Sequence, residues 1–268
     1  MEWSPDPTQY HKYLRARIQR GLGVRSGTSY RPWKNIRDNG THGGSAGCVR
    51  GIRVDRLYEI LDQPARTYFF LLERAQEIVD IRESWPILDI DSTLRLSGKF
   101  GINHPKHDIY PEPICLDFLI TEKGLEGLGY RAVTLAADVK HLHARNRKLM
   151  QVTRQWCADH EIDWTVVDTS GLDRTVIDAL RFIRGWYINR FQPDPEIADT
   201  FAKLFLDRYQ NNLLLNELIE LVRKDLRIGP EVALNLFRYC AWSHRIPVSL
   251  RARLAKNCPV SLLVAEND

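Results

Sequence analysis

An acidic residue inside an apolar strand is the feature of this sequence that most restricts its fold. Residues 114–121 are mostly apolar around Asp117, and after three glycines residues 131–137 alternate apolar and small side chains. The pattern predicts two strands joined by a turn within residues 112–140. A carboxylate in such a strand costs free energy unless a cation, a hydrogen-bond network or a ligand compensates it. Asp117 is therefore the first candidate functional residue.

Length and composition indicate a globular protein. The chain has 268 residues, of which 44% are hydrophobic and 27% are charged, which is enough for one large domain or two smaller ones. It contains no apolar run of about 18 residues, and its first residues lack the basic and then apolar pattern of a secretory signal. A cytoplasmic protein without a membrane segment is expected. The five cysteines are scattered without metal-ligand spacing, so we expect reduced thiols.

Positive charge is concentrated near the N-terminus. Residues 1–60 contain eleven Lys and Arg against five Asp and Glu, and residues 22–51 combine Gly, Ser, Asn and Arg with aromatic residues. Such an arm suits a DNA phosphate backbone, although a flexible connector or a solvated surface would have the same composition. Histidines within 104–107 suit a backbone or phosphate hydrogen bond better than metal ligation. The candidate DNA contacts here are Arg25, Arg31, Trp33, Lys34, His104 and Lys106.

The first part of the chain is predicted to be a mixed α/β domain. An apolar stripe with helical spacing starts at residue 57, but Pro64 moves the expected start of the helix to that residue. The segment between residues 88 and 112, which contains two glycines, is expected to be a loop. The predicted helices are 7–21, 64–74 and 145–160, and the predicted strands are 78–88, 114–121, 131–137 and 164–168.

The second part, residues 172–268, is predicted to be mostly helical, with a domain boundary near Gly171. A short extended piece at 244–250 after the last helix gives the layout of a helix-turn-helix with a small wing. Its basic residues would contact DNA phosphates, unless the module binds protein and its aromatic residues are core. An apolar run at 260–265 is expected to be exposed and to dock on a partner. The predicted helices are 173–190, 195–208, 212–225 and 230–242, and the candidate DNA contacts are Arg238, His244, Arg245 and Arg251.

Six short motifs occur in a characteristic order: SYRPW (29–33), FLLE (70–73), VDIRESWPI (79–87), GINHP (101–105), LDFLI (116–120) and IDW (162–164). This set resembles the TnsA family, the endonuclease subunits of heteromeric transposases. The resemblance implies a restriction-endonuclease-like domain over 1–171 and a winged-helix domain over 172–268. It also implies a bacterial, Mg²⁺-dependent enzyme that cleaves the non-transferred strands at transposon ends. Its implied partners are transposon-end DNA, a TnsB-like DDE transposase and a TnsC-like AAA+ ATPase.

The resemblance also assigns catalytic positions. The strand aspartate of the family falls on Asp117, its helix glutamate on the position of Ala65, and its lysine on the position of Ala136. Thr134 stands where a relative has a carboxamide metal ligand and is a weak ligand, while the backbone carbonyl of Leu135 is a further candidate. Because one carboxylate is missing, the affinity for Mg²⁺ is expected to be weakened.

Two alanines at catalytic positions in an otherwise intact chain indicate inactivation, by engineering in the favoured interpretation or by natural loss. Natural loss would leave a non-catalytic assembly module that bridges the transposase, the AAA+ regulator and DNA. A stand-alone restriction-type nuclease is a third hypothesis. Asp138 and Lys140 offer a replacement acid and amine on the same strand face, but Lys140 would lie about 13 Å further along the strand, which disfavours this rescue.

Overall fold

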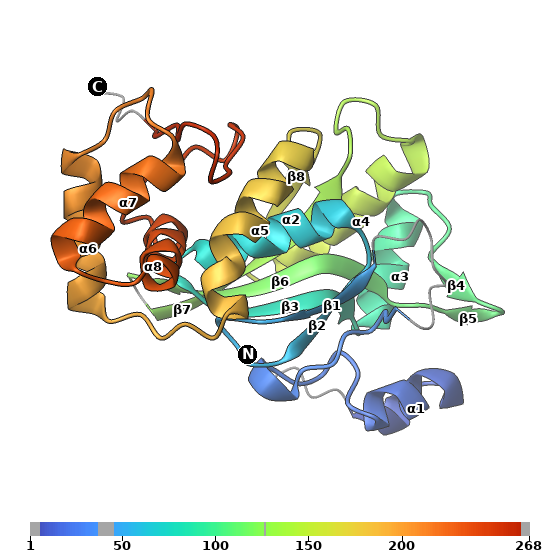
Figure 1. The fold of residues 1–268 in the computed structure, drawn as a ribbon. Helices are drawn as coiled ribbons and strands as arrows, with labels where there is room; N and C mark the ends of the chain where they lie inside the picture. The colour runs from blue at the N-terminus through green and yellow to red at the C-terminus, as the bar shows by residue number, and fades with distance from the viewer. Residues whose placement is uncertain (1–5, 37–45, 126, 264–268) are drawn as a thin grey trace. The chain divides into compact units, whose positions relative to one another are not determined.

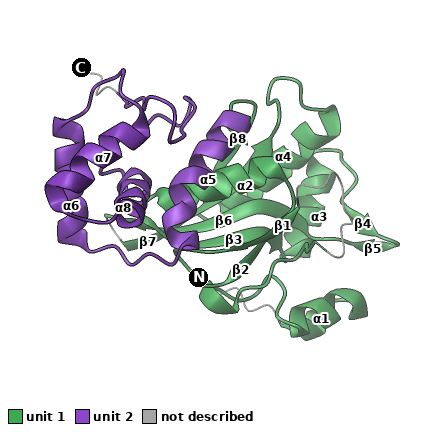
Figure 2. Ribbon diagram, in the orientation of Figure 1, with its two compact units in different colours: residues 1–171 green, residues 172–268 purple. Residues whose placement is uncertain are grey.

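The computed structural model describes residues 6–36, 46–125 and 127–263, and the chain divides into two compact units. Unit 1 comprises residues 1–171 and unit 2 comprises residues 172–268, as coloured in Figure 2. None of the helices in the described part of the chain is long and apolar enough to cross a membrane.

Unit 1 is built on a four-stranded sheet with the order β3-β6-β7-β8 (Figure 1). The first three strands are antiparallel to their neighbours, and β8 pairs with β7 in parallel. The predicted hairpin is present as β6 and β7, but pairing continues to Gly124 opposite Gly127, so Gly129 lies inside β7 rather than in the turn. The strands are β3 (Ile78–Ile87), β6 (Ile114–Gly124), β7 (Gly127–Ala136) and β8 (Asp163–Asp168).

Helices α2 (Gln63–Arg74) and α4 (Ala144–Asp159) cover opposite faces of this sheet. Phe118 of β6 meets the ring of Tyr68 in α2, with 5.9 Å between ring centroids. The next residue, Leu119, belongs to the core cluster that contains the α4 residue Trp156. Because successive side chains of a strand point to opposite faces, the two contacts place the two helices on the two faces.

The strands β3 and β6 twist sharply at Asp117. Leu116 and Leu119 belong to the same core cluster, although a regular strand would point residues three apart to opposite faces. Across from Asp117, Ser84 of β3 has a left-handed φ of 46° and lies between Glu83 and Trp85, which pair with the residues on either side of Asp117. Asp117 therefore lies where the regular alternation of side chains between the two faces of the sheet is interrupted.

The segments before β3 are more ordered than the sequence predicts. The stripe from residue 57 begins as a strand, β2, and the predicted loop after residue 88 contains helix α3, which Asp89 caps through Ser92. The shorter elements of unit 1 are η1 (Pro7–Gln9), α1 (Lys12–Gln19), η2 (Gly27–Ser29), β1 (Gly47–Arg50), β2 (Leu57–Ile60), α3 (Ile90–Lys99), β4 (Lys106–His107) and β5 (Tyr110–Pro111).

Unit 2 contains four helices in its described residues but no strand. In place of the predicted wing, Val248 forms an isolated bridge with Leu262. The expectation of an exposed run at 260–265 is wrong at Val260, which is buried and accepts a hydrogen bond on its carbonyl from Tyr209, while residues 264 and 265 lie outside the described residues. The helices are α5 (Arg174–Ile188), α6 (Pro195–Asp207), α7 (Leu215–Leu226) and α8 (Pro230–Trp242).

A buried ion pair connects Arg56, the residue before β2, to Glu83 of β3, which is next to Ser84. Arg56 donates to both carboxylate oxygens of Glu83 and to the carbonyl of Ile81, and the side chains of the pair are only 5% and 3% exposed. Glu83 also accepts the backbone N–H of Glu59 at 3.0 Å. Each charge is thus compensated by the other, and removal of one leaves the other buried and uncompensated.

We predict that Glu83→Gln lowers the free energy of unfolding by about 3–5 kcal/mol, because the charge of Arg56 stays buried. The free energy of unfolding of the double variant Arg56→Met/Glu83→Gln should fall clearly less, because no uncompensated charge is then buried. Urea denaturation of the three proteins measures both values. A single variant that is no less stable than the double variant would contradict the role of the pair.

Candidate active site at the split between β6 and β7

The site begins where two paired strands separate. The pairing of β6 with β7 ends at Phe118 and Val133. Beyond that point the backbone N–H of Leu135 donates to the carboxylate of Asp117, with 2.6 Å between nitrogen and Oδ2. The carboxylate of Asp117 therefore accepts the hydrogen bond that a backbone carbonyl of β6 would accept in a continuous pair of strands. Its other oxygen, Oδ1, does not take part in this hydrogen bond.

The surroundings of Asp117 favour its protonated form. Water reaches the side chain, but the protein atoms packed around it desolvate the carboxylate and raise its pKa to about 6. The hydrogen bond from Leu135 and the charge of Lys34 act in the opposite direction and lower this pKa, while Asp62 raises it further. Two charged groups from the N-terminal part of unit 1 therefore act on the strand aspartate.

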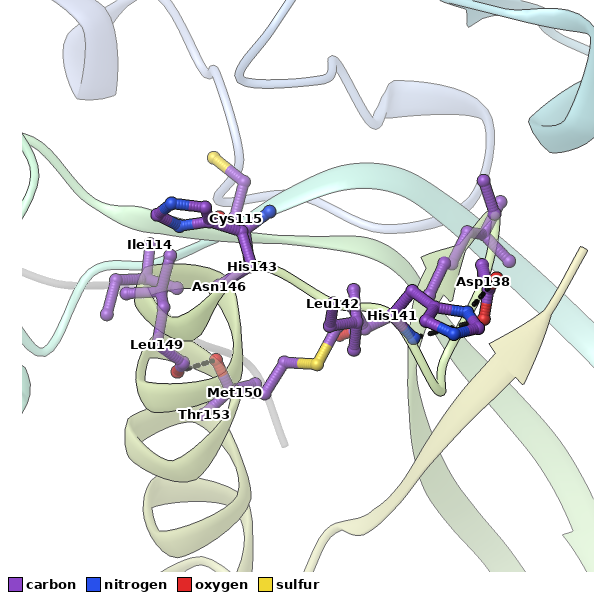
Figure 3. Close-up of a pocket in the computed structure, with 14 residues that line it drawn as sticks. Ile114, Cys115, Asp138, His141, Leu142, His143, Asn146, Leu149, Met150 and Thr153 are labelled. Carbon is purple, nitrogen blue, oxygen red and sulfur yellow. Dashed lines mark hydrogen bonds and ion pairs between the residues drawn. The ribbon is translucent and has the colours of Figure 1, made fainter.

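A cavity of about 480 Å³ opens beside this split, at the end of β7 (Figure 3). Asp138 and His141 face each other there, with 2.6 Å between Oδ2 and Nδ1, and Asp138 also accepts the backbone N–H groups of Lys140 and His141. Asp117 is not part of the lining, but its hydrogen-bond partner Leu135 is. The lining residues are Ile114, Cys115, Thr134, Leu135, Ala136, Ala137, Asp138, His141, Leu142, His143, Asn146, Leu149, Met150 and Thr153.

The two alanine positions carry only methyl side chains. Ala136 lines the cavity, and its carbonyl accepts the backbone N–H and the hydroxyl of Thr169 at 2.8 and 3.2 Å. Ala65 lies in the first turn of α2, where its N–H donates to Asp62 at 2.7 Å. A methyl group neither ligates a metal ion nor transfers a proton, so these positions supply no reactive group.

The two other predicted metal ligands, the hydroxyl of Thr134 and the carbonyl of Leu135, differ in their surroundings. The hydroxyl of Thr134 accepts the indole N–H of Trp164 at 3.1 Å, so it is engaged on the β8 side. The carbonyl of Leu135 leaves the strand on the same side as its N–H, which points to Asp117.

Magnesium requires six oxygen ligands in near-octahedral geometry. Within the described residues no group of three or more His, Cys, Asp or Glu could hold a metal ion. The positions that the family resemblance assigns, with alanine at two of them, therefore do not fit a Mg²⁺ ion held by protein groups alone.

Two of the predicted DNA contacts in unit 1 are buried. Trp33 is fully buried, and its indole donates to Glu112 at 2.7 Å. The ring of His104 lies between the hydroxyl of Thr93 and the carbonyl of Pro105, both at 2.9 Å, and burial lowers its pKa. Their side chains serve the fold in this structure. The other candidates, Arg25, Arg31, Lys34 and Lys106, are exposed.

The predicted DNA contacts of unit 2 also differ from one another. Arg238 lies over the ring of Phe182 at 5.0 Å, and desolvation lowers its pKa. Arg245 pairs with Asp199 at 2.6 Å, a hydrogen bond that raises the pKa of the arginine. His244 and Arg251 are exposed.

The sequence reasoning did not connect Lys34 or Asp62 with Asp117. The sequence pattern assigns Lys34 to the basic arm and gives Asp62 no functional role. A signal was present for Asp62, because an aspartate before Gln63-Pro64 marks a helix N-cap one turn ahead of Ala65. For Lys34 the sequence carried no signal, because only the fold brings residue 34 to β6.

Comparison with known proteins gives one distant similarity. No family model matches the chain. The chain is 23% identical over 169 residues to the transposon Tn7 transposition protein TnsA of Escherichia coli. The aligned region covers 62% of this chain and 60% of that protein, so the chain spans less than two thirds of its relative. These values support a distant, TnsA-like relationship for a mixed α/β protein with a central sheet.

The pKa of Asp117 predicts how its substitution changes stability. Between the usual aspartate value of about 4 and about 6 the folded protein binds this proton more tightly than the unfolded chain does. Stability from this group is therefore lost as the pH rises through that window. Asp117→Asn should gain stability relative to the parent from about pH 4 to about pH 7 and stay level above it, as measured by urea denaturation.

Asp168→Asn is the matched control for this measurement. Hydrogen bonds from Ser170 lower the pKa of Asp168, so its stability contribution has the opposite sign and is lost at lower pH. A stability difference between parent and Asp117→Asn that does not change with pH would contradict the raised pKa.

Proposed function

We propose that this chain is a TnsA-like subunit of a Tn7-type DNA transposition complex. It would act at transposon ends beside a DDE transposase, under an AAA+ ATPase regulator. The proposal depends chiefly on one observation: Asp117 lies at the split of β6 and β7, within the LDFLI motif and between the other motifs of the family. The similarity to the Tn7 protein TnsA supports the same reading.

In an active enzyme of this class, the helix and strand carboxylates would hold Mg²⁺, which would supply polarisation of the scissile phosphate and a lower pKa of the attacking water. This chain keeps the strand aspartate, oriented by the N–H of Leu135, and a candidate carbonyl ligand on the same residue. It lacks the helix carboxylate and the strand lysine at positions 65 and 136. We therefore propose that the chain does not cut efficiently with the residue set of its family.

A second candidate function is that of an assembly module. The twist at Asp117, the hydrogen bond from Leu135 and the packing of α2 and α4 on the sheet are all present although two reactive side chains are absent. A fold that keeps the backbone geometry of a nuclease active site but lacks two of its reactive side chains suits a subunit that holds DNA and partner proteins in place.

Restoring the two side chains tests the proposed function. Ala65→Glu/Ala136→Lys, assembled with its transposase and transposon-end DNA, should raise Mg²⁺-dependent nicking of the non-transferred strand at least about 100-fold over the parent. Adding Asp117→Asn should remove that gain, because the strand carboxylate is then missing. Nicking is measured on end-labelled duplexes.

The parent chain provides the complementary result. It should enter the complex with transposase and end DNA as well as the restored variant does, because assembly does not need the missing groups. A parent that fails to join the complex, or a restored variant that stays inactive within it, would contradict the proposed function.

A further inference from the structure

The cavity at the end of β7 has the size and the lining of a binding site for a small organic group. Its volume of about 480 Å³ lies within the range of cavities that bind small ligands. Polar side chains in the lining lie beside the apolar side chains of Ile114, Leu142, Leu149 and Met150. This mixture suits a planar heterocycle, which has apolar faces and a polar edge.

Helix α4 forms one wall of this cavity. Its lining residues are spaced by three or four positions, which places them on one face of the helix: Asn146, Leu149, Met150 and Thr153. Leu149 also packs against the core cluster between the sheet and α4, so the fold holds this wall in place. Figure 3 shows Met150 extending from α4 towards Leu142. Because methionine is unbranched and flexible, it adapts its shape to a bound ligand.

Two polar groups of the lining are available for the edge of such a ligand. The Nδ1 atom of His141 pairs with Asp138 at 2.6 Å, so Nε2 is the ring nitrogen that can bind a ligand. The side-chain amide of Asn146 offers donors and an acceptor, and it has no hydrogen-bond partner among the described residues. Groups of both kinds can read the edge of a nucleobase that has left its stack.

Two arginines flank the lining face of α4. Arg145 and Arg147 are the sequence neighbours of Asn146, so they lie about 100° to either side of it around the helix. The guanidinium of Arg147 donates to the carbonyl of Leu142 at 3.4 Å, which places it at the rim of the cavity. Both arginines are exposed, and neither forms an ion pair within the part of the chain that the structure describes.

The stability of α4 does not explain these positive charges. Both arginines lie in the first turn, which contains no acidic residue, and a cation there opposes the helix dipole. The carboxylate in the lining, that of Asp138, is already bonded to His141 and to two backbone N–H groups. An anion at the rim would therefore compensate two guanidinium groups, which bind phosphate through paired hydrogen bonds.

We propose that this cavity binds an unpaired base of a DNA strand, while Arg145 and Arg147 hold the phosphates of the same strand. Leu135 lines the cavity and donates its N–H to Asp117, so the bound nucleotide lies next to the strand aspartate. The assignment of the strand to transposon-end DNA rests on the proposed function, whereas the binding of an unpaired nucleotide does not.

Two single-stranded oligonucleotides test whether a base occupies the cavity. One is a fluorescein-labelled hexamer of thymidine nucleotides, and the other has the same phosphates but no bases. The full chain should bind the thymidine hexamer at least about fivefold more tightly, as measured by fluorescence anisotropy. Equal affinity for the two hexamers would overturn the proposal.

Filling the cavity should remove this preference. Ala137 lines the cavity and is exposed, so Ala137→Leu occupies space there without changing the core or adding an aromatic ring. The variant should bind both hexamers equally. Ala158→Leu, at an exposed position near the other end of α4 and outside the lining, should keep the preference of the parent. A preference that both variants keep, or that both lose, would contradict the location of the base.

The arginines have a distinct signature. Arg147→Gln should weaken the binding of both hexamers by a similar factor of about threefold to tenfold, because the phosphates are common to both. Arg154→Gln removes the same charge from an exposed position further along α4 and is the control. A loss with Arg147→Gln no larger than that with Arg154→Gln would overturn the role of the arginine.

Competition with thymidine monophosphate separates a DNA strand from a free nucleotide. The monophosphate should displace the thymidine hexamer only at concentrations far above the Kd of the hexamer, because it carries a single phosphate. Displacement near that Kd would overturn the assignment to a strand. Failure of the proposed function has a different outcome: the chain would not join the transposase, but its preference for the hexamer with bases would still be lost in Ala137→Leu.

Discussion

The hydrogen bond from the N–H of Leu135 to the carboxylate of Asp117 is the interaction on which the site depends. It replaces a backbone pair at the point where β6 and β7 separate, so the sheet opens without leaving the N–H of Leu135 unpaired. Opposite it, the left-handed Ser84 turns β3, and the arm hydrogen bonds to the carbonyl of that residue. The twist, the split and the anchored arm therefore meet at one carboxylate.

The sequence predicted the elements that have a strong local signal. The hairpin around Asp117 follows from alternation and glycines, and the helices of unit 2 follow from their apolar period. Helix α3 was missed because its glycines suggested a loop, although Asp89 gives it a side-chain cap. The sequence predicts a DNA contact at Trp33, which is buried, because an aromatic residue among basic ones has the same pattern whether it is buried or exposed.

The candidate site could be predicted only in part, because only one of its residues has a local sequence signal. Asp117 stands out by itself, since a carboxylate in an apolar strand is conspicuous. Lys34 and Asp62 act on the pKa of Asp117 from segments distant in sequence, Lys34 beside the residue that hydrogen bonds to Ser84 and Asp62 at the N-cap of α2. A motif comparison examines fixed positions, so it identifies the alanine at position 65 but not the charge of Asp62 that acts on Asp117.

The chain combines a distant similarity to TnsA with an aspartate on β6 whose pKa is raised by desolvation. In the proposed function, transposon-end DNA is held at Asp117. The most direct measurement is a structure of the chain bound to its transposase and transposon-end DNA. If the proposed function is right, a phosphate of the non-transferred strand lies beside the Asp117 carboxylate. A DNA path that leaves Asp117 facing solvent would contradict it.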